Sequence, residues 1–194
     1  SLTFSVRMTK NGILCDDGTS RVCLDPKKSD FDGINFVSHA HTDHLPSKNG
    51  GTILSSIETN EIAELRGFKM ENHTKSLENF SLIDSGHILG ARGLLFDDIF
   101  YTGDICTRDR GFLQGAKIPK CKTLITECTF GLAEFIFPAL DEIKKQVNEL
   151  ISELYGKGIP VILMGYQLGK AQTITQLFGH WGPLYLHDSV KEMN

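Results

Sequence analysis

The sequence predicts a layered α/β fold, and two observations lead to that prediction. The first part of the chain reads as short β segments separated by turns such as Lys10-Asn11-Gly12 and Asp16-Asp17-Gly18. After Gly131 the pattern changes to longer helical segments that alternate with short apolar runs. Strands first and alternating helices and strands later suit sheets that are covered by helices.

The predicted strands of the first part are short, apolar and bounded by turn residues. One helix is expected among them, over residues 56–66, because Gly67 is well placed to end it. The expected strands cover residues 2–7, 12–15, 21–24, 34–37, 51–55, 80–84, 91–96, 99–102 and 123–127.

The second part contains the most amphipathic helix of the chain, expected over residues 138–155 and closed by Gly156-Lys157-Gly158. Strands are expected over residues 159–164 and 183–187, and further helices over 169–178 and 188–194. We therefore divide the chain into residues 1–131 and residues 132–194.

Composition excludes several classes of protein. Hydrophobic residues make up 40% and charged residues 23%, which is ordinary for a globular protein, and no apolar run approaches a membrane span. No signal peptide opens the sequence, and five cysteines without a C-x-x-C pair favour reduced thiols over disulfides or a thiolate zinc site. We expect a cytoplasmic protein with no membrane partner.

The net charge of −4 does not by itself indicate nucleic-acid binding. One local stretch, residues 105–125, is basic and carries a net charge of +4. It is either a solvated loop or a patch that steers a nucleic-acid backbone. Its charged residues are Arg108, Arg110, Lys117, Lys120 and Lys122, against Asp109 alone.

The segment 38–45, SHAHTDHL, places four strong metal ligands within six residues, directly after an apolar, β-prone run. His39 and His41 are two residues apart, so both side chains can face one divalent cation from a strand-end loop. Asp43 and His44 follow the turn and can face a second cation. Imidazole and carboxylate ligands suit zinc, manganese or iron rather than calcium.

This pattern, H-x-H-x-D-H after a strand, resembles the metallo-β-lactamase superfamily. Two later stretches stand where that family has its next ligands: DSGHILGA, which contains His87, and FYTGDI, which contains Asp104. The phrases GHILGA, YTGD and ECTFG are similar to the β-CASP nucleases. Those enzymes include mRNA 3′-end processing factors and DNA-ligase-associated exonucleases.

The resemblance implies the αββα metallo-β-lactamase sandwich, with the metal site in residues 1–131. Residues 132–194 would either begin a β-CASP-like cap or complete the sandwich. The resemblance also implies a nuclease, with RNA as the first candidate substrate and DNA as the second. The nuclease would use two divalent ions, with zinc ahead of manganese or iron. In that reading His39, His41 and His87 bind one ion, Asp43 and His44 bind the other, and Asp104 bridges both.

For four further residues the sequence leaves both a functional and a purely structural role open. Asp25 stands where the superfamily often has a carboxylate that fixes a ligating imidazole, or it is a turn former before Pro26. Glu127 matches the acidic residue of the β-CASP enzymes and is expected, with Asp43 and Asp104, to be catalytic; otherwise it is a strand-end carboxylate. Gly169 and Lys170 would contact a phosphate at a helix start, or form a plain strand-to-helix turn.

The family also has a late histidine that completes the second metal, and the printed sequence has no clear counterpart. We expect either a naturally short or truncated form of the family, or a last position that is filled by water, His187 or a partner chain in a homodimer. The second site would otherwise be partly occupied. Two other functions therefore remain open. One is a non-catalytic, metal-stabilised protein that binds nucleic acid or a partner, and the other is a generic hydrolase of small substrates.

Overall fold

The computed structural model describes residues 3–48 and 50–194, and the chain forms two compact units. The first unit runs to Asp109 and also contains Leu113–Glu127, while the second contains Arg110–Phe112 and Cys128–Asn194. The described residues form a mixed α/β structure with two sheets and four helices, which confirms the predicted class. The division at residue 131 stays a prediction.

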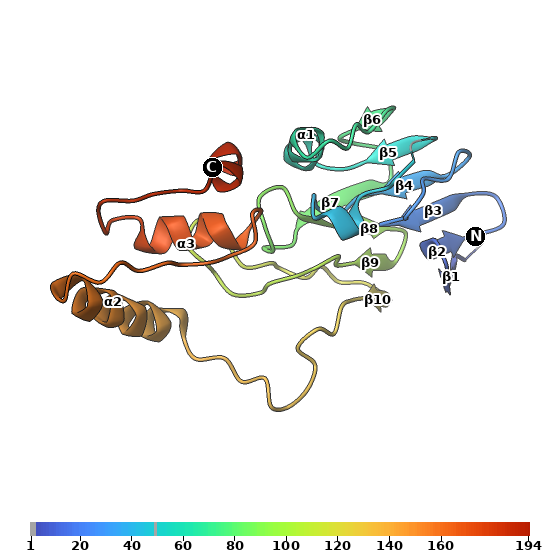
Figure 1. Cartoon of the computed structure of the whole chain (residues 1–194). Helices are drawn as coiled ribbons and strands as arrows, with labels where there is room; N and C mark the ends of the chain where they lie inside the picture. Colours follow the sequence, from blue (N-terminus) through green and yellow to red (C-terminus); the bar gives the residue numbers. More distant parts are fainter. Residues whose placement is uncertain (1–2, 49) are drawn as a thin grey trace. The chain divides into compact units, whose positions relative to one another are not determined.

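The first sheet begins with a hairpin and continues with parallel strands (Figure 1). β1 pairs antiparallel with β2 and β2 with β3, whereas β3, β4, β5 and β6 run parallel to one another. In sheet order the strands are β1 (Ser5–Thr9), β2 (Gly12–Asp16), β3 (Arg21–Leu24), β4 (Ile34–Phe36), β5 (Thr52–Leu54) and β6 (His73–Thr74).

The second sheet has the order β10-β9-β8-β7. Its antiparallel strands are β7 (Phe80–Asp84), β8 (Arg92–Phe96) and β9 (Ile99–Tyr101), and β10 (Thr123–Ile125) pairs parallel with β9. The two sheets share one apolar core. Phe36 of β4 and Tyr101 of β9 meet edge to face there, with ring centroids 6.1 Å apart. The buried cluster comprises Cys15, Val22, Leu24, Phe36, Leu54, Leu94, Phe96, Ile99 and Tyr101.

Helix α1 (Ile57–Leu65) follows β5 and begins where the sequence predicts. Ser56 caps its N-terminus, because the Ser56 hydroxyl accepts a hydrogen bond from the Thr59 amide at 3.1 Å. The predicted strands of the first unit agree with the observed ones to within a few residues at each end. The expected start of the first strand, Leu2, lies outside the described residues.

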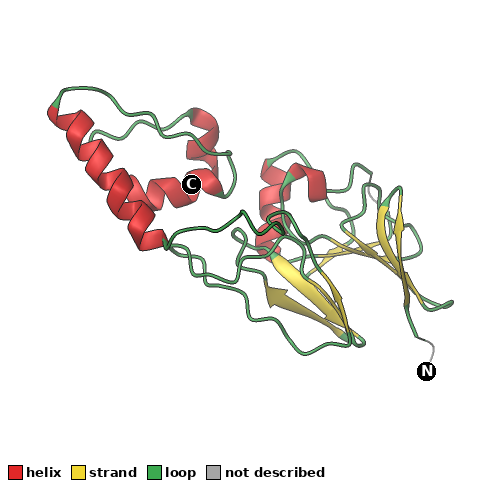
Figure 2. Ribbon diagram, turned by 90° about the horizontal axis from the view of Figure 1, so that it is seen from below, coloured by secondary structure: helices red, strands yellow, loops and turns green. Residues whose placement is uncertain are grey.

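The second unit contains α2 (Leu140–Gly156), α3 (Lys170–Phe178) and α4 (Asp188–Met193), joined by loops (Figure 2). The predicted helices are confirmed, but the predicted strands over residues 159–164 and 183–187 are wrong. Both segments are irregular in the structure, because no neighbouring strand among the described residues pairs with them. Across the described part of the chain, no helix combines the length and apolar character of a membrane span.

Candidate metal centre

The histidine-rich loop leaves the first sheet at the end of β4. Val37, Ser38, His39 and Ala40 are buried, and Thr42–His44 then form a single turn of 3₁₀ helix. This turn reverses the chain, so His39 and His41 face one region while His44 returns toward the neighbouring strand β3. Burial of the loop root fixes the direction of the first imidazole, because the His39 side chain is fully enclosed.

A hydrogen-bonded chain fixes the tautomer of His39. The Ser38 hydroxyl donates to Asp25 Oδ2 at 2.6 Å, so its oxygen accepts from His39 Nδ1 at 2.8 Å. His39 therefore carries its ring proton on Nδ1 and presents the lone pair of Nε2 to the centre. Burial, together with the nearby charges of His44, His87 and His41, lowers the pKa of His39 far below its usual value. The imidazole is neutral, as a metal ligand must be.

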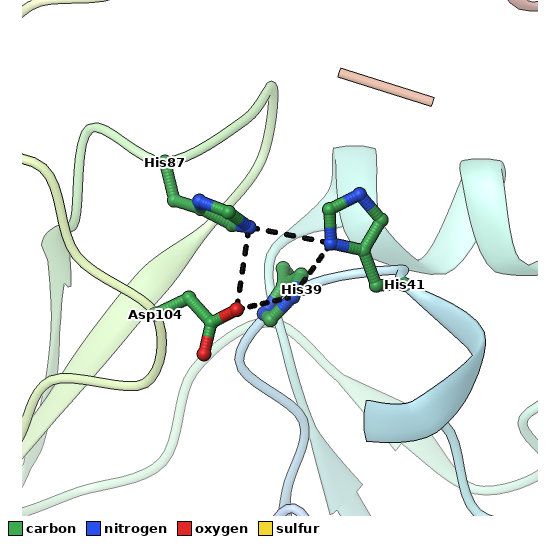
Figure 3. A group of neighbouring side chains, drawn as sticks. All are labelled: His39, His41, His87 and Asp104. Atoms are coloured by element: carbon green, nitrogen blue, oxygen red, sulfur yellow. Dashed lines mark hydrogen bonds and ion pairs between the residues drawn. The ribbon is translucent and has the colours of Figure 1, made fainter. Parts of the chain in front are cut away.

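Four side-chain atoms converge on one point, and they come from both sheets of the first unit (Figure 3). His41 Nδ1 lies 3.1 Å from His39 Nε2 and 3.2 Å from His87 Nε2. Asp104 Oδ2 lies 3.7 Å from His39 Nε2 and 3.5 Å from His87 Nε2.

These separations match the spacing of ligands around one cation. Zinc bonds of about 2.0–2.1 Å place tetrahedral ligand atoms about 3.3 Å apart. The four atoms all lie within 4.8 Å of one another, and three imidazoles with one carboxylate are a common donor set for zinc, manganese and iron. The cluster could therefore bind a metal ion.

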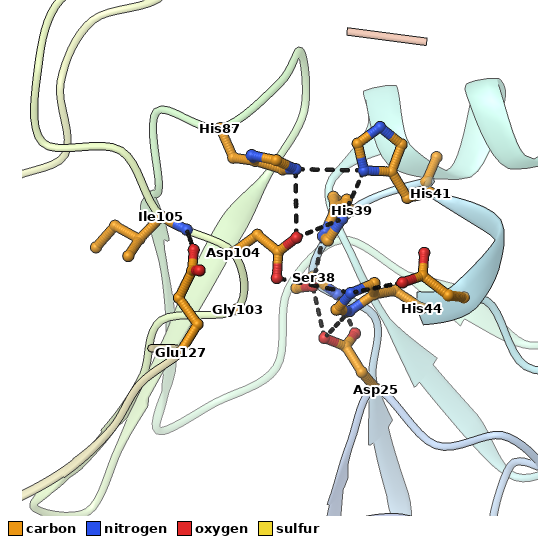
Figure 4. Close-up of polar contacts among 12 residues, drawn as sticks. Asp25, Ser38, His39, His41, His44, His87, Gly103, Asp104, Ile105 and Glu127 are labelled. Carbon is orange, nitrogen blue, oxygen red and sulfur yellow. Dashed lines mark hydrogen bonds and ion pairs between the residues drawn. The ribbon is translucent and has the colours of Figure 1, made fainter. Parts of the chain in front are cut away.

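A second group of atoms meets on the other side of Asp104 (Figure 4). His44 Nε2 lies 3.6 Å from Asp104 Oδ1 and 3.6 Å from Asp43 Oδ2. The two oxygens of Asp104 thus face different histidines: Oδ2 faces His39 and His87, and Oδ1 faces His44. Burial and the neighbouring acids raise the pKa of Asp104, although the charge of His44 opposes them.

Asp25 contacts His44 on the ring nitrogen that faces away from Asp104. Its Oδ2 accepts from Tyr101 Oη at 2.7 Å and lies 2.9 Å from His44 Nδ1, while its Oδ1 accepts from the Ser38 amide at 2.7 Å. Burial works to lower the pKa of His44, but the hydrogen bond and charge of Asp25, with Asp104 and Asp43, raise it to about 9. Asp25 thus contacts the Nδ1 atom of His44, and its role in fixing a metal-ligating imidazole stays a prediction.

Two glycines allow the loops of the second sheet to approach the centre. Gly86 has a φ of +69°, and a Cβ there would lie 2.4 Å from the Cys106 carbonyl oxygen. Gly103 has a φ of +56°, and a Cβ there would lie 2.7 Å from the Ser38 Cβ. These positions bring His87 and Asp104 close to the histidine-rich loop of the first sheet.

Two contacts outside the ligand set also position the loops. The Arg66 guanidinium donates to the Ala40 carbonyl at 3.0 Å, between His39 and His41. The Ile105 amide donates to Glu127 Oε1 at 2.8 Å, immediately after Asp104. Sequence reasoning assigned no role to Arg66, Ser38 or Tyr101. Arg66 and Tyr101 lie far from the ligand motif in the sequence, and Ser38 opens that motif but acts together with Asp25, 13 residues away.

Comparisons with known proteins bear on this geometry. No protein-family model matches the chain. An RNase J-like protein from Methanocaldococcus jannaschii is 27% identical over 213 aligned residues, which cover 91% of this chain and 51% of that protein. A probable DNA ligase from Opitutus terrae is 27% identical over 154 residues, covering 72% of this chain and 15% of the ligase. The transcription termination factor FttA of M. jannaschii is 28% identical over 102 residues, covering 48% and 16%.

These relatives fit the β-CASP branch of the metallo-β-lactamase superfamily. The predicted β-CASP resemblance is confirmed, at modest identity. The chain spans about half of the RNase J-like protein and a smaller share of the other two. Their names concern RNA cleavage, DNA joining and transcription termination, so nucleic-acid processing is the theme that these names share.

The predicted roles of Glu127, Gly169, Lys170 and His187 stay predictions, and the structure shows only their contacts. Glu127 contacts the backbone beside Asp104, and its catalytic role stays a prediction. Gly169 and Lys170 lie in the second unit, where the Gly169 amide donates to Gln172 Oε1 at 2.6 Å and Lys170 lies over the Tyr166 ring. His187 caps α4, since its ring accepts from the Ser189 amide.

Proposed function

We propose that this chain is a metal-dependent phosphodiesterase that hydrolyses nucleic acid. The observation that carries the proposal is the placement of Asp104, whose two oxygens face two separate histidine groups. A carboxylate in that position suits a pair of cations that share one ligand. The names of the relatives support nucleic acid as the substrate class.

In this proposal His39, His41 and His87 hold the first cation, Asp43 and His44 hold the second, and Asp104 contacts both. When bound, a pair of divalent cations supplies Lewis-acid chemistry for phosphodiester hydrolysis. The neutral state of His39 keeps the positive charge of the cations available to an anionic substrate.

The remaining residues of the proposal orient these ligands. Asp25 fixes His44 by its Nδ1, and the hydrogen bond from Ile105 to Glu127 fixes the turn that carries Asp104. Asp43 is 80% exposed, so the second group faces solvent, where a substrate phosphate could enter. Glu127 would also act on the leaving group if a late histidine partners it.

The proposal also includes three finer points. The metal is zinc, the substrate is RNA in preference to DNA, and the first unit has the αββα sandwich fold. RNA takes precedence because the RNase J-like relative covers 91% of this chain. The five cysteines are free thiols, which favours a reducing compartment, and we include a cytoplasmic location. A homodimer is also proposed, and sedimentation of a single monomeric species would refute it.

The test is a cleavage time course on 5′-labelled single-stranded RNA with added Zn²⁺ or Mn²⁺. Parallel reactions contain a chelator, single-stranded DNA, or the His87→Ala variant. Metal-dependent cleavage that the variant loses would establish the nuclease, and preference between the two substrates would settle RNA against DNA. No cleavage by metal-loaded protein would refute the proposal, and RNA binding that survives chelation would then favour a binding protein.

Bis-p-nitrophenyl phosphate distinguishes a generic hydrolase of small substrates from a nuclease and from a non-catalytic binding protein. Hydrolysis of that small diester by metal-loaded protein, with no action on RNA or DNA, would favour a generic hydrolase. The same assay on the His87→Ala variant controls for contaminating phosphodiesterase.

A further inference from the structure

A groove of about 540 Å³ lies on the first unit, beside the end of β3 that leads into Asp25. The turn between β1 and β2 forms one wall, and the loop after Pro26 forms another. Strand register explains this position, because Ile13 pairs with Leu24 and the turn therefore reaches past the end of β3. A Cβ on Gly12 would lie 3.3 Å from the Asp25 carbonyl oxygen.

The groove is basic although the chain is acidic overall. Its lining includes Lys10, Arg21, Lys27 and Lys28, with Asp30 as the one acid. Arg21 and Asp30 neutralise each other, since Nε of the guanidinium lies 2.6 Å from the carboxylate. The three lysines are exposed and form no ion pair with any other described residue. Three positive charges therefore remain available to a ligand.

The backbone that carries two of these lysines is held from both sides. Asn11 Nδ2 donates to the Lys28 carbonyl at 2.7 Å, and Asn11 Oδ1 accepts from the Lys28 amide at 2.7 Å. The Lys27 amide donates to the Asn11 carbonyl at 2.9 Å, and the Lys27 carbonyl accepts from the Ser47 amide and hydroxyl. The backbone of Lys27 and Lys28 is thus already ordered, which reduces the conformational entropy that is lost when a ligand binds.

The groove and the candidate metal centre share one end of the first sheet. Lys27 follows Asp25 by two residues, and Asp25 contacts His44. Ser47, which holds Lys27, follows the same histidine-rich loop by a few residues. A polyanion in the groove would therefore lie near the end of the sheet from which the histidine-rich loop leaves β4.

We propose that this groove binds the phosphate backbone of the nucleic acid, away from the phosphodiester that is cut. The proposed function supplies the ligand class, and this inference rests on it. Lysine ammonium groups contact phosphates as point charges and carry no sequence information. The groove should therefore raise affinity for any sequence and should make that affinity strongly dependent on salt.

The test measures binding of a short, labelled single-stranded RNA by fluorescence anisotropy, on metal-free protein so that no cleavage occurs. The variant is Lys10→Gln/Lys27→Gln/Lys28→Gln. Three lost contacts should reduce the slope of log K against log salt by about 2, and should raise Kd on the order of 100-fold at about 0.1 M salt. Arginines at the same three positions should retain binding.

The matched control is Lys69→Gln/Lys75→Gln/Lys145→Gln, which removes the same charge elsewhere. Lys69 and Lys75 flank β6, at the opposite edge of the sheet from β1, and Lys145 lies on α2. Equal weakening in both triple variants, or no weakening in the groove variant, would overturn the proposal. Equal binding of polyglutamate, with the same loss in the groove variant, would overturn nucleic acid as the ligand.

This binding assay is independent of catalysis. Metal-loaded wild-type protein that fails to cleave RNA would refute the proposed function but would leave a groove-dependent salt slope intact. If the groove variant and the control both cleave RNA with the same small loss of rate, the nuclease proposal is supported. The proposal that the groove binds the phosphate backbone is then refuted. The two proposals therefore fail in distinguishable ways.

Discussion

Replacing Asp25 with asparagine tests how far the metal centre depends on the carboxylate behind it. Asp25 accepts hydrogen bonds from the Ser38 amide, the Ser38 hydroxyl and Tyr101 Oη, and contacts His44 Nδ1. Its φ of +45° is a conformation that asparagine tolerates well, so the backbone should not change. The substitution removes one charge and turns one acceptor into a donor.

The expected loss follows from these contacts. The amide oxygen can keep the position of Oδ2, with three partners, but the amide nitrogen then faces the Ser38 amide. One buried donor loses its acceptor, and three hydrogen bonds lose their charge. The free energy of unfolding of the metal-free protein should fall by about 2–3 kcal/mol, and Tm by about 4–12 °C. Without its anchor, His44 should bind the proposed second cation, measured as Zn²⁺, about 10–100-fold more weakly.

Urea unfolding followed by circular dichroism measures the first effect, and competition with a chromophoric chelator measures the second. Asp97→Asn is the matched control, since Asp97 is exposed and has a φ of +49°. It should change the free energy of unfolding by no more than about 0.5 kcal/mol. Unchanged zinc affinity in the Asp25→Asn protein, or an equal loss in the control, would refute the role given to Asp25.

Three further predictions concern other parts of the first unit. Arg66→Ala removes the hydrogen bond to the Ala40 carbonyl and should weaken binding of the first zinc about 10-fold by chelator competition; unchanged affinity would contradict a positioning role. Zinc at 100 times its Kd should raise the free energy of unfolding by about 2.7 kcal/mol, and His87→Ala should lose most of this gain in urea titrations. The hydrogen bond from Arg21 lowers the pKa of Asp30, so the stability that Asp30 contributes is complete above its ordinary pKa and is lost as pH falls through the lowered one. Urea titrations of Asp30→Asn and wild type should therefore differ most above about pH 5 and converge in acid; a constant difference would contradict this linkage.

Most of the first unit was predictable from sequence because its signals are local, although the two-residue strand β6 (His73–Thr74) was not expected. Strand 21–24 matches β3 fully, and Ser56 marks the start of α1 through its own hydroxyl. The histidine motif likewise brings its residues together within a single turn. The position of Asp104 between two histidine groups was expected only from the family resemblance, because it depends on the packing of two sheets and no spacing in the sequence encodes it.

The second unit shows where local signals fail. Residues 159–164 have the apolar, β-branched composition of a strand, and residues 183–187 combine two leucines with a tyrosine. A strand exists only when another strand satisfies its backbone groups, and neither segment pairs with one among the described residues. Tyr101 was unpredictable for a related reason. Its burial suits a core residue, and only the fold places its hydroxyl 2.7 Å from Asp25.

The four converging side chains also have a consequence for how the protein unfolds. His39 and His41 follow strand β4 of the first sheet, whereas His87 follows β7 and Asp104 follows β9 of the second sheet. A cation held by all four would join the two sheets at one edge of their shared core. Separation of the sheets would then require ligand loss, so the bound ion should slow unfolding more than it accelerates folding, because these contacts span 65 residues and form late. The lifetime of the native state would depend on how fast the ion dissociates.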